Sequence, residues 1–337
     1  MSKLENELLA LKNDPTVTAD DPIDTKTIEE KAEWLRHKKI NRAYSTGKRV
    51  EMEIAKTQNL DLRTIPDNFY EDLQAKAKEI RQAQKVSMPF ITAKLTELVP
   101  LSFPNLITIG ATSGSGKTTA AANITFQLYK NGQRVLILSN EELSLDVLDR
   151  ISCMELGYDV NKRSTFTDEQ NTELDKLRPI VGEFVRVVDT TYAGNPQLTC
   201  SVEGIDAILK SLEKQEAYYD CIILDYYQKV TISKENPNQN DHETLMELSN
   251  ILDKAYKVVK APIVVMCQLH PSSKEANDFE KRIKSGKSIM MVSTCVVELE
   301  RVEGVDYASD WICHKDRWGK SGKTVRTTWI KGKFKDT

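Results

Sequence analysis

The hydrophobic pattern of this chain changes near residue 88. Before that point the sequence is charged, has few β-branched runs and breaks into stretches with helical spacing around residues 27–44, 49–58 and 67–85. From Met88 onward, short apolar runs alternate with segments of helical length. This alternation predicts an α/β fold, in which a mostly parallel sheet is covered by helices on both faces.

Several apolar runs are candidate strands of this sheet. Each is rich in Val, Ile and Leu, and each is separated from the next by a polar or helical segment. The chain is expected to divide into a mobile N-terminus (residues 1–25), a small helical appendage (26–87) and the α/β domain (88–337). The candidate strands are residues 106–109, 135–139, 184–188, 221–224, 263–267, 294–299, 311–314 and 325–330.

The last helical stretch before the α/β domain has one narrow apolar stripe. Phe69, Leu73, Ala77 and Ile80 recur at helical spacing on an otherwise polar segment. A stripe of this kind packs on another surface. That surface is either the chain's own domain or a neighbouring subunit, and the pattern favours neither.

Composition restricts the classes of function. With 47 Lys and Arg against 50 Asp and Glu, the net charge is −3, so any binding of nucleic acid has to be local. The six cysteines contain no C-x-x-C pair, which indicates reduced thiols and no disulfide framework or zinc site. Without a signal-like start or an apolar run of about 18 residues, the chain is expected to be cytoplasmic and to have no membrane partner.

A glycine-rich stretch, residues 110–119, lies between the apolar run 106–109 and the alanine-rich segment 120–129. A strand, a loop and a helix in this order are the context of a phosphate-binding loop. Gly114 and Gly116 let backbone N–H groups turn inward around phosphate oxygens, at the positive end of the following helix. The stretch therefore predicts a bound nucleoside triphosphate.

Two side chains of this loop suit a triphosphate with its metal ion. Lys117 can reach the β- and γ-phosphates, and the Thr118 hydroxyl is placed to ligate a Mg²⁺ that bridges them. The first glycine of the usual pattern is replaced by Ala111, while Gly110 lies one residue early. The predicted nucleotide-binding residues of the loop are Ala111, Thr112, Ser113, Gly114, Ser115, Gly116, Lys117, Thr118 and Thr119.

Three other candidate strands end in polar side chains. Asp225 is placed to hold the Mg²⁺ shell, and either Glu141 or Glu142 can orient the attacking water. The amide of Gln268 can bond both a phosphate oxygen and the next loop, as a sensor of nucleotide state. Because the carboxyl ends of parallel strands share one edge of the sheet, hydrolysis of the bound triphosphate is expected at that edge.

Two clusters of basic residues lie late in the chain. Residues 314–335 hold eight Lys or Arg against one Asp, and the predicted hairpin there presents Lys315 and Arg317. These two cations can serve a nucleotide on a neighbouring subunit, contact a phosphate backbone, or simply face solvent. Residues 281–287 form the second cluster, which suits a loop that grips a sugar-phosphate backbone, or a solvated face.

The ordered set of motifs resembles the ATPase domain of the DnaB-type hexameric replicative helicases, within the RecA-like P-loop superfamily. The resemblance covers roughly residues 88–333. Its most specific parts are the aspartate strand followed by Tyr-x-Gln and the late Lys-x-Arg-x-Gly. The motifs that carry it are residues 111–118, 139–141 with Arg150 downstream, 222–228, 267–269, 285–289 and 315–319.

The resemblance implies an active site completed by two subunits. Within one chain, it implies that Lys117 and Thr118 hold ATP and Mg²⁺, that Glu141 is the catalytic carboxylate with Glu142 as the alternative, and that Gln268 is the switch. It further implies that Arg150 belongs to the nucleotide site and Asp225 to the metal shell. Lys315 and Arg317 would complete the site of the next subunit in a ring, expected to be a homo-hexamer.

The resemblance also implies partners for the motor. Single-stranded DNA would be gripped by Arg282, Lys284, Ser285, Gly286 and Lys287, and ATP hydrolysis would drive translocation during DNA replication. A primase or a helicase loader is the expected protein partner, in the cytoplasm, or in the host cytoplasm if the chain is phage-encoded. The family's globular N-terminal domain has no counterpart in residues 1–87, which instead suit a helix that links each subunit to its neighbour.

Two other functions share the same core. A recombinase-like ATPase would assemble as an open filament on DNA, although the Lys-x-Arg hairpin after the glutamine strand argues against it. A RecA-like ring ATPase that regulates or loads a protein partner is consistent with the overall acidity of the chain.

Overall fold

A computed structural model describes residues 88–99, 101, 105–191, 197–214, 219–231, 241–270, 279–283, 287–317 and 319–337. The chain divides into two compact units, Met1–Glu79 and Ile80–Thr337, and every described residue belongs to the second unit. The expected mobile N-terminus and the expected helices of residues 26–87 therefore lie outside the described residues.

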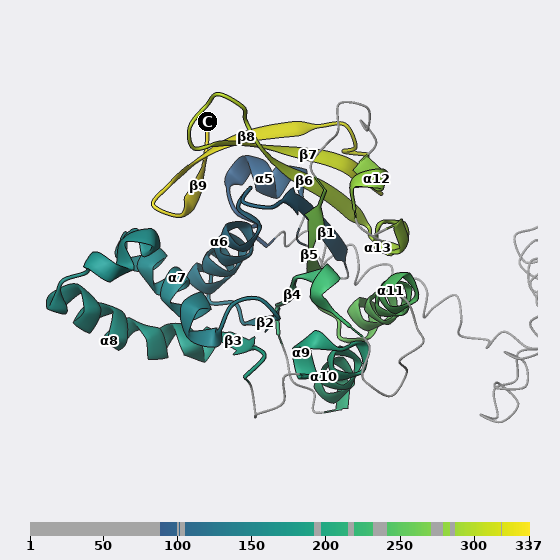
Figure 1. The fold of residues 1–337 in the computed structure, drawn as a ribbon, viewed down its shortest axis with the longest axis horizontal. Helices are drawn as coiled ribbons and strands as arrows, with labels where there is room; N and C mark the ends of the chain where they lie inside the picture. The colour runs from purple at the N-terminus through teal and green to yellow at the C-terminus, as the bar shows by residue number, and fades with distance from the viewer. Residues whose placement is uncertain are drawn as a thin grey trace, which may run out of the picture. The chain divides into compact units, whose positions relative to one another are not determined.

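The second unit is built on one nine-stranded sheet with the order β3-β2-β4-β5-β1-β6-β7-β8-β9 (Figure 1). The strands from β3 to β6 pair in parallel, and β7, β8 and β9 continue the sheet in antiparallel fashion. The predicted α/β fold with a largely parallel sheet is thereby confirmed. The strands are β1 Leu106–Thr112, β2 Val135–Ser139, β3 Val185–Val188, β4 Cys221–Asp225, β5 Ile263–Leu269, β6 Cys295–Arg301, β7 Ala308–Asp316, β8 Thr324–Ile330 and β9 Lys333–Asp336.

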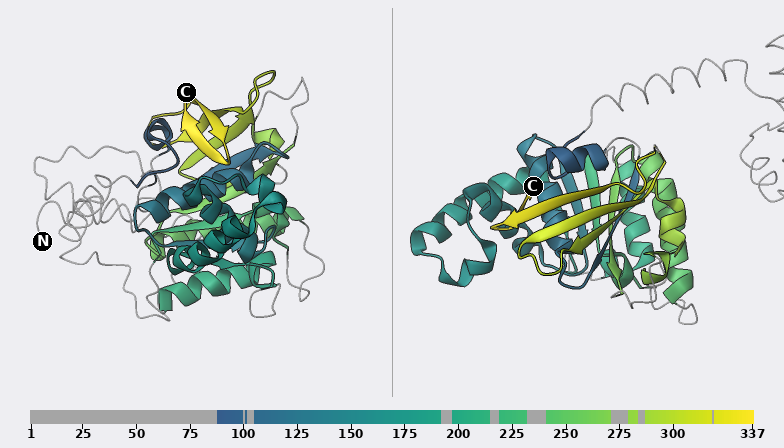
Figure 2. Two further views of the ribbon diagram at one scale, coloured as in Figure 1. Left: turned by 90° about the vertical axis from the view of Figure 1, so that its left-hand side faces the viewer. Right: turned by 90° about the horizontal axis from the view of Figure 1, so that it is seen from above.

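Helices cover both faces of this sheet (Figure 2). Helices α5 to α8 pack on one face, and α10, α11 and α13 pack on the other. None of the described helices is long and apolar enough to cross a bilayer. The helices are α5 Ala93–Leu98, α6 Lys117–Lys130, α7 Ser144–Leu156, α8 Asp168–Phe184, α9 Gln197–Cys200, α10 Val202–Lys214, α11 Asp241–Val258, α12 Phe279–Arg282 and α13 Lys287–Val292, with 3₁₀ turns η1 Val160–Thr165 and η3 Tyr227–Lys229.

The two faces explain why the strands read as continuous apolar runs. In β5, Val264 and Met266 belong to the core on one face, while Ile263, Val265 and Cys267 belong to the core on the other. Successive side chains of a strand point to opposite faces, so a strand buried on both sides needs an apolar residue at every position.

Several observed strands extend beyond their predicted ranges, one residue predicted in a strand belongs to a helix, and one strand was not predicted. Phe184 was expected to begin a strand, but it ends α8, and its ring lies 5.8 Å from that of Tyr129 in an edge-to-face contact. Strand β9 was not predicted, because its short sequence alternates lysines with a single aromatic residue. That residue, Phe334, is buried and packs edge-on against Trp311 at 5.3 Å, so tertiary contact creates the strand.

Asp189 follows β3 and fixes the start of α7. Its carboxylate accepts hydrogen bonds from the backbone N–H and the hydroxyl of Ser144, and from the same two groups of Thr191. Burial by itself would raise the pKa of this carboxyl group, but these hydrogen bonds lower the pKa to about 2. Because Leu143 at the N-cap of α7 offers no side-chain cap, Asp189 serves as the acceptor there.

We expect Asp189→Asn to lower the free energy of unfolding by about 1–2 kcal/mol at neutral pH, because the charged acceptor is lost. The pKa of Asp189 is lower in the folded chain than in the unfolded one, so its stabilisation is complete above about pH 4 and is lost as the pH falls toward 2. Urea denaturation at neutral pH and near pH 3 should therefore show a smaller difference between variant and wild type in acid.

The matched control for this comparison is Asp206→Asn. Asp206 forms an exposed ion pair with Lys210 one helical turn away, at 2.6 Å, and its loss should change stability by about 0.5 kcal/mol or less. An Asp189→Asn deficit of equal size at both pH values would show that the carboxylate charge is not the stabilising feature.

Candidate nucleotide-binding and catalytic site

The glycine-rich stretch connects the end of β1 to the start of α6. Gly114 and Gly116 have φ angles of 75° and 96°, in the left-handed region where a side chain would be strained. The turn is closed by a hydrogen bond from the Ser115 backbone N–H to the Thr112 carbonyl oxygen at 3.2 Å, and the hydroxyls of these two residues are bonded to each other. Lys117 then begins a 14-residue helix, whose amino end favours an anion.

The alanine that replaces the usual first glycine is explained by the strand. Ala111 still lies in β1, where it pairs with Gln268 on one side and Leu299 on the other, so it needs no unusual backbone conformation. Gly110 is required for a different reason. A Cβ atom there would lie 2.9 Å from the ring of Phe279 and 3.0 Å from the side chain of Leu269. Its role is close packing, and the phosphate turn itself begins after β1.

Lys117 lies among acidic and aromatic groups. Its Nζ is 3.6 Å from Glu141 Oε2 and 3.5 Å from the centre of the Tyr226 ring. Asp225, only 3% exposed, lies near the Thr118 hydroxyl. Burial raises the pKa of Asp225 to about 6, although the nearby Lys117 and the Thr118 hydroxyl act in the opposite direction.

A magnesium ion fits the chemistry of this cluster. One carboxylate oxygen of Asp225, Oδ1, is buried and has no hydrogen-bond partner among the described residues. The Thr118 hydroxyl beside this carboxylate adds a second hard oxygen donor. The described residues contain no group of three or more His, Cys, Asp or Glu side chains that could hold a metal ion. A site with so few protein ligands is typical of Mg²⁺, which takes its other ligands from phosphate and water.

The two glutamates that follow β2 have different surroundings and different partners. Glu141 is 38% exposed and lies near two amines, Lys117 at 3.6 Å and Lys229 at 4.0 Å. Glu142 instead forms an ion pair with Arg150, with 2.6 Å between Oε1 and Nη2, and its backbone is bonded to the Ser139 hydroxyl. The guanidinium of Arg150, predicted at the nucleotide site, is thus occupied by a carboxylate of its own chain.

Asn140 lies in the motif of residues 139–141, but no role was predicted for it from the sequence. Its side chain forms two hydrogen bonds with the backbone of Tyr226: it accepts one from the N–H at 2.7 Å and donates one to the carbonyl oxygen at 3.0 Å. Its own backbone N–H donates to the Asp225 carbonyl at 2.9 Å, and the Asp225–Tyr226 peptide is cis. Asn140 therefore holds the segment after β4 in place, with the Tyr226 ring against Lys117. The sequence offered one signal for this role, an asparagine placed directly after an apolar run.

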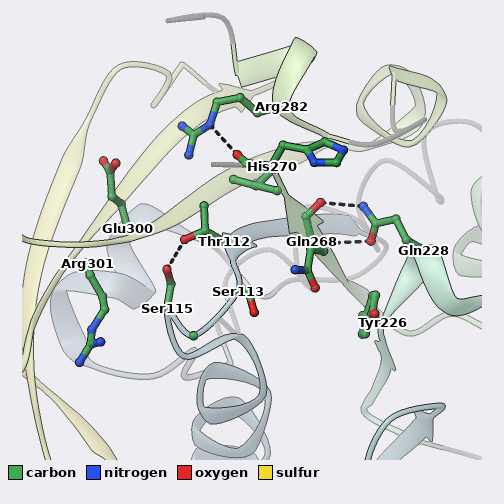
Figure 3. A pocket seen from close by; sticks show the side chains of 12 residues that line it. Thr112, Ser113, Ser115, Tyr226, Gln228, Gln268, His270, Arg282, Glu300 and Arg301 are labelled. Atoms are coloured by element: carbon green, nitrogen blue, oxygen red, sulfur yellow. Dashed lines mark hydrogen bonds between the residues drawn. The ribbon is translucent and has the colours of Figure 1, made fainter. Parts of the chain in front are cut away.

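A cavity of about 740 Å³ opens between the phosphate loop and the ends of β5 and β6 (Figure 3). Gln268 lies on its wall, and the Gln228 side chain holds the Gln268 backbone through hydrogen bonds of 2.8 and 2.9 Å. Glu300 and Arg301 at the end of β6 also line it, and they were missed although they follow an apolar strand as the other site residues do. The remaining lining residues are Thr112, Ser113, Gly114, Ser115, Tyr226, Leu269, His270 and Arg282.

Lys315 and Arg317 lie at the opposite edge of the sheet. Ile107 near the start of β1 pairs with Cys295, and Cys295 pairs with Asp316, whereas the phosphate loop follows the far end of β1. The length of β1, at about 3.3 Å per residue, lies between these two groups. The Arg317 side chain is exposed, and Lys315 Nζ donates to the last carbonyls of α13 at 2.6 and 3.0 Å.

The residues predicted to bind DNA are only partly described. Lys284, Ser285 and Gly286 lie outside the described residues. The Arg282 side chain is 11% exposed and its guanidinium lies 2.6 Å from a carboxylate oxygen of Glu298. Lys287, at the start of α13, is exposed. Among the described members of this set, Lys287 is thus the cation that faces solvent.

Solved structures share this architecture at low sequence identity. One of them, described as an ATPase domain, aligns with a TM-score of 0.65 at 15% identity, covering 81% of this chain and 100% of that one. A DnaB-like replicative helicase, described with its interactions with primase, aligns with a TM-score of 0.61 at 16% identity, covering 91% and 78%. A KaiC-like protein, PH0186 from Pyrococcus horikoshii OT3, aligns at 0.52 with 12% identity, covering 74% and 98%.

These similarities show a RecA-like fold. No curated protein sequence matches the chain. The family model of the DnaB-like helicase C terminal domain matches residues 97–334, which span strands β1 to β8, the start of β9 and both groups of predicted site residues. The chain therefore belongs to the family of DnaB-like helicase C-terminal domains.

Proposed function

We propose that this protein is an ATP-driven DNA helicase that acts as a homo-hexameric ring and moves along single-stranded DNA during replication. One observation carries the proposal. The phosphate loop and the exposed Arg317 lie at opposite edges of one sheet, so a nucleotide on the loop can be reached by Arg317 only from another copy of the chain. A ring places these two edges against each other at every interface.

Within one chain, the proposed roles follow from the geometry around Lys117. The loop amides and Lys117 bind the triphosphate, and Thr118 with Asp225 holds Mg²⁺. A Mg²⁺ held there would supply positive charge that offsets the negative charge developing on the phosphates. Glu141, whose partners are two amines at 3.6 and 4.0 Å, orients the attacking water, while Glu142 stays paired with Arg150.

Across the interface, Arg317 is the proposed arginine finger. Its side chain is exposed, and a guanidinium can stabilise the charge of the transition state on the neighbour's nucleotide. Lys315 has to leave the carbonyls of α13 to reach the same nucleotide. Gln268, held on the cavity wall by Gln228, is proposed to sense whether the γ-phosphate is present.

Binding of DNA is proposed to be local. The chain has a net charge of −3, so the contact depends on the cluster that includes the exposed Lys287, together with Lys284, Ser285, Gly286 and Arg282. A primase or a helicase loader is the proposed protein partner, and the proposed location is the cytoplasm, or that of the host if the chain is phage-encoded.

Single-stranded DNA should accelerate ATP hydrolysis by the full-length protein, and a forked duplex should be unwound in an ATP-dependent strand-displacement assay. Both results are expected because ATP hydrolysis and the binding of single-stranded DNA are coupled in the proposed motor. Hydrolysis that ignores DNA would favour a ring ATPase with a protein partner. Stimulated hydrolysis without unwinding would favour a recombinase-like filament.

Lys117→Ala and Arg317→Ala should each abolish most hydrolysis, the second by about 1,000-fold, because the finger acts in the transition state. Mixing the two variants should restore measurable activity, since some interfaces then combine an intact Lys117 with an intact Arg317. Each variant alone, at the same total protein concentration, is the control. A mixture that is no more active than the two separate variants would show that Arg317 does not act at the nucleotide site of the neighbouring subunit.

Glu141→Gln should reduce the rate of hydrolysis by about 100-fold or more while ATP still binds, because a neutral amide cannot polarise the attacking water. Glu142→Gln is the matched control one residue away. Its carboxylate is paired with Arg150, so this variant should retain most of the activity. The reverse order of the two variants in single-turnover hydrolysis would assign the role to Glu142.

A further inference from the structure

Glu298 is a buried carboxylate in the middle of β6 with one partner on each side. It is 2% exposed; its Oε1 lies 2.6 Å from Arg282 Nη1, and its Oε2 lies 2.8 Å from His314 Nε2. A carboxylate so far from water is costly unless it is paired, so these two contacts are needed wherever Glu298 is charged. Glu298 thereby joins α12 to β7.

Arg282, the partner of Glu298 on α12, belongs to the segment that is proposed to bind DNA. Arg282 ends α12, and its carbonyl accepts a hydrogen bond from the His270 backbone N–H at 2.7 Å. The next residue, Ile283, forms an antiparallel bridge with Leu269, directly after Gln268 at the end of β5. The segment around Arg282 is therefore fastened both to Glu298 and to the strand of the proposed sensor.

The partner on β7 belongs to the strand that leads to the proposed finger. His314 lies three positions before Arg317, and Lys315 between them holds the carboxyl end of α13 through Met290 and Met291. Helix α13 begins at the exposed Lys287. Helix α12 is thus anchored on β6 through Glu298, and α13 is anchored on the neighbouring strand β7 through Lys315.

The cluster also touches the strand that leads to the phosphate loop. The Phe279 ring stacks on His314, with 4.0 Å between ring centres and 12° between planes. The same ring lies so close to Gly110 that a Cβ atom there would come within 2.9 Å of it. Phe279 is buried, and Gly110 lies one residue before the loop pattern at Ala111. A displacement of α12 is therefore opposed by β1, β6 and β7 together.

We propose that Glu298 is a positioning residue that couples DNA binding at the Arg282 and Lys287 segment to ATP hydrolysis, by tying α12 to the strand that leads to Arg317. The inference rests on the proposed function. Glu298 is buried and is not one of the residues proposed to bind the nucleotide or DNA. It provides the rigid connection through which a change at Arg282 is transmitted to β7, and such contiguous packed networks carry coupling between sites.

The test compares ATP hydrolysis by the full-length chain with and without a single-stranded oligonucleotide, for wild type and Glu298→Gln. The glutamine keeps the volume but removes the charge shared by Arg282 and His314. We expect basal hydrolysis to stay within about twofold, whereas the stimulation by DNA falls about fivefold or more, as for loss of a typical coupling. Affinity for the oligonucleotide, measured by fluorescence anisotropy, should be retained.

A second variant covers the case in which Glu298→Gln unfolds. His314→Phe keeps an aromatic ring for the stack on Phe279 but removes the contact with Glu298, and it should show the same selective loss of stimulation. The control on the same strand is Asp310→Asn, which breaks an ion pair with Arg326 at 2.7 Å outside this network and should be stimulated as the wild type is.

The outcomes distinguish this inference from the proposed function. Wild-type hydrolysis that does not respond to DNA overturns the proposed function, and this inference with it, before any variant is considered. A responsive wild type, together with a folded Glu298→Gln or His314→Phe that responds equally, overturns the inference alone. A variant that loses basal hydrolysis and stimulation in equal proportion assigns Glu298 a purely structural role and overturns the inference as well.

Discussion

Hydrogen bonding between parallel strands brings all their carboxyl ends to one edge of the sheet, and the proposed active site depends on this constraint. Thr118, Glu141, Asp225 and Gln268 are far apart in the sequence, yet each lies at or after the end of a strand that pairs in parallel with its neighbour. Strand β7 runs antiparallel to β6, so Arg317, which directly follows β7, is carried to the opposite edge. The proposed need for a second subunit follows from this reversal between β6 and β7.

The charges at that edge are arranged for a cationic ligand and a phosphate. Asp225 is buried, and one of its oxygens has no hydrogen-bond partner in the part of the chain that the structure describes. Burial raises the pKa of Asp225 to about 6 and leaves its charged form in need of a cation. Lys117 is held between Glu141 and the Tyr226 ring, and Asn140 fixes the backbone that carries this ring. Such preorganised groups need little rearrangement when substrate binds, which is the main source of electrostatic catalysis.

The ion pairs of the chain differ in what they can contribute. Exposed pairs such as Asp206 with Lys210 contribute little, because solvent screens them. The pairs of Glu298 are shielded from water, and losing one partner leaves an uncompensated charge in the interior. A buried carboxylate shared by two elements constrains their relative position, which is why Glu298 suits a role in coupling.

The sequence by itself determined the fold class, eight of the nine strands and the residues of the phosphate loop, because apolar periodicity and glycine spacing are local properties. Only the tertiary structure paired Glu142 with Arg150, Arg282 with Glu298 and Lys315 with α13. It also revealed why Gly110 is a glycine and why residues 333–336 form a strand. These features depend on which distant side chains meet in space, and no local pattern encodes such contacts.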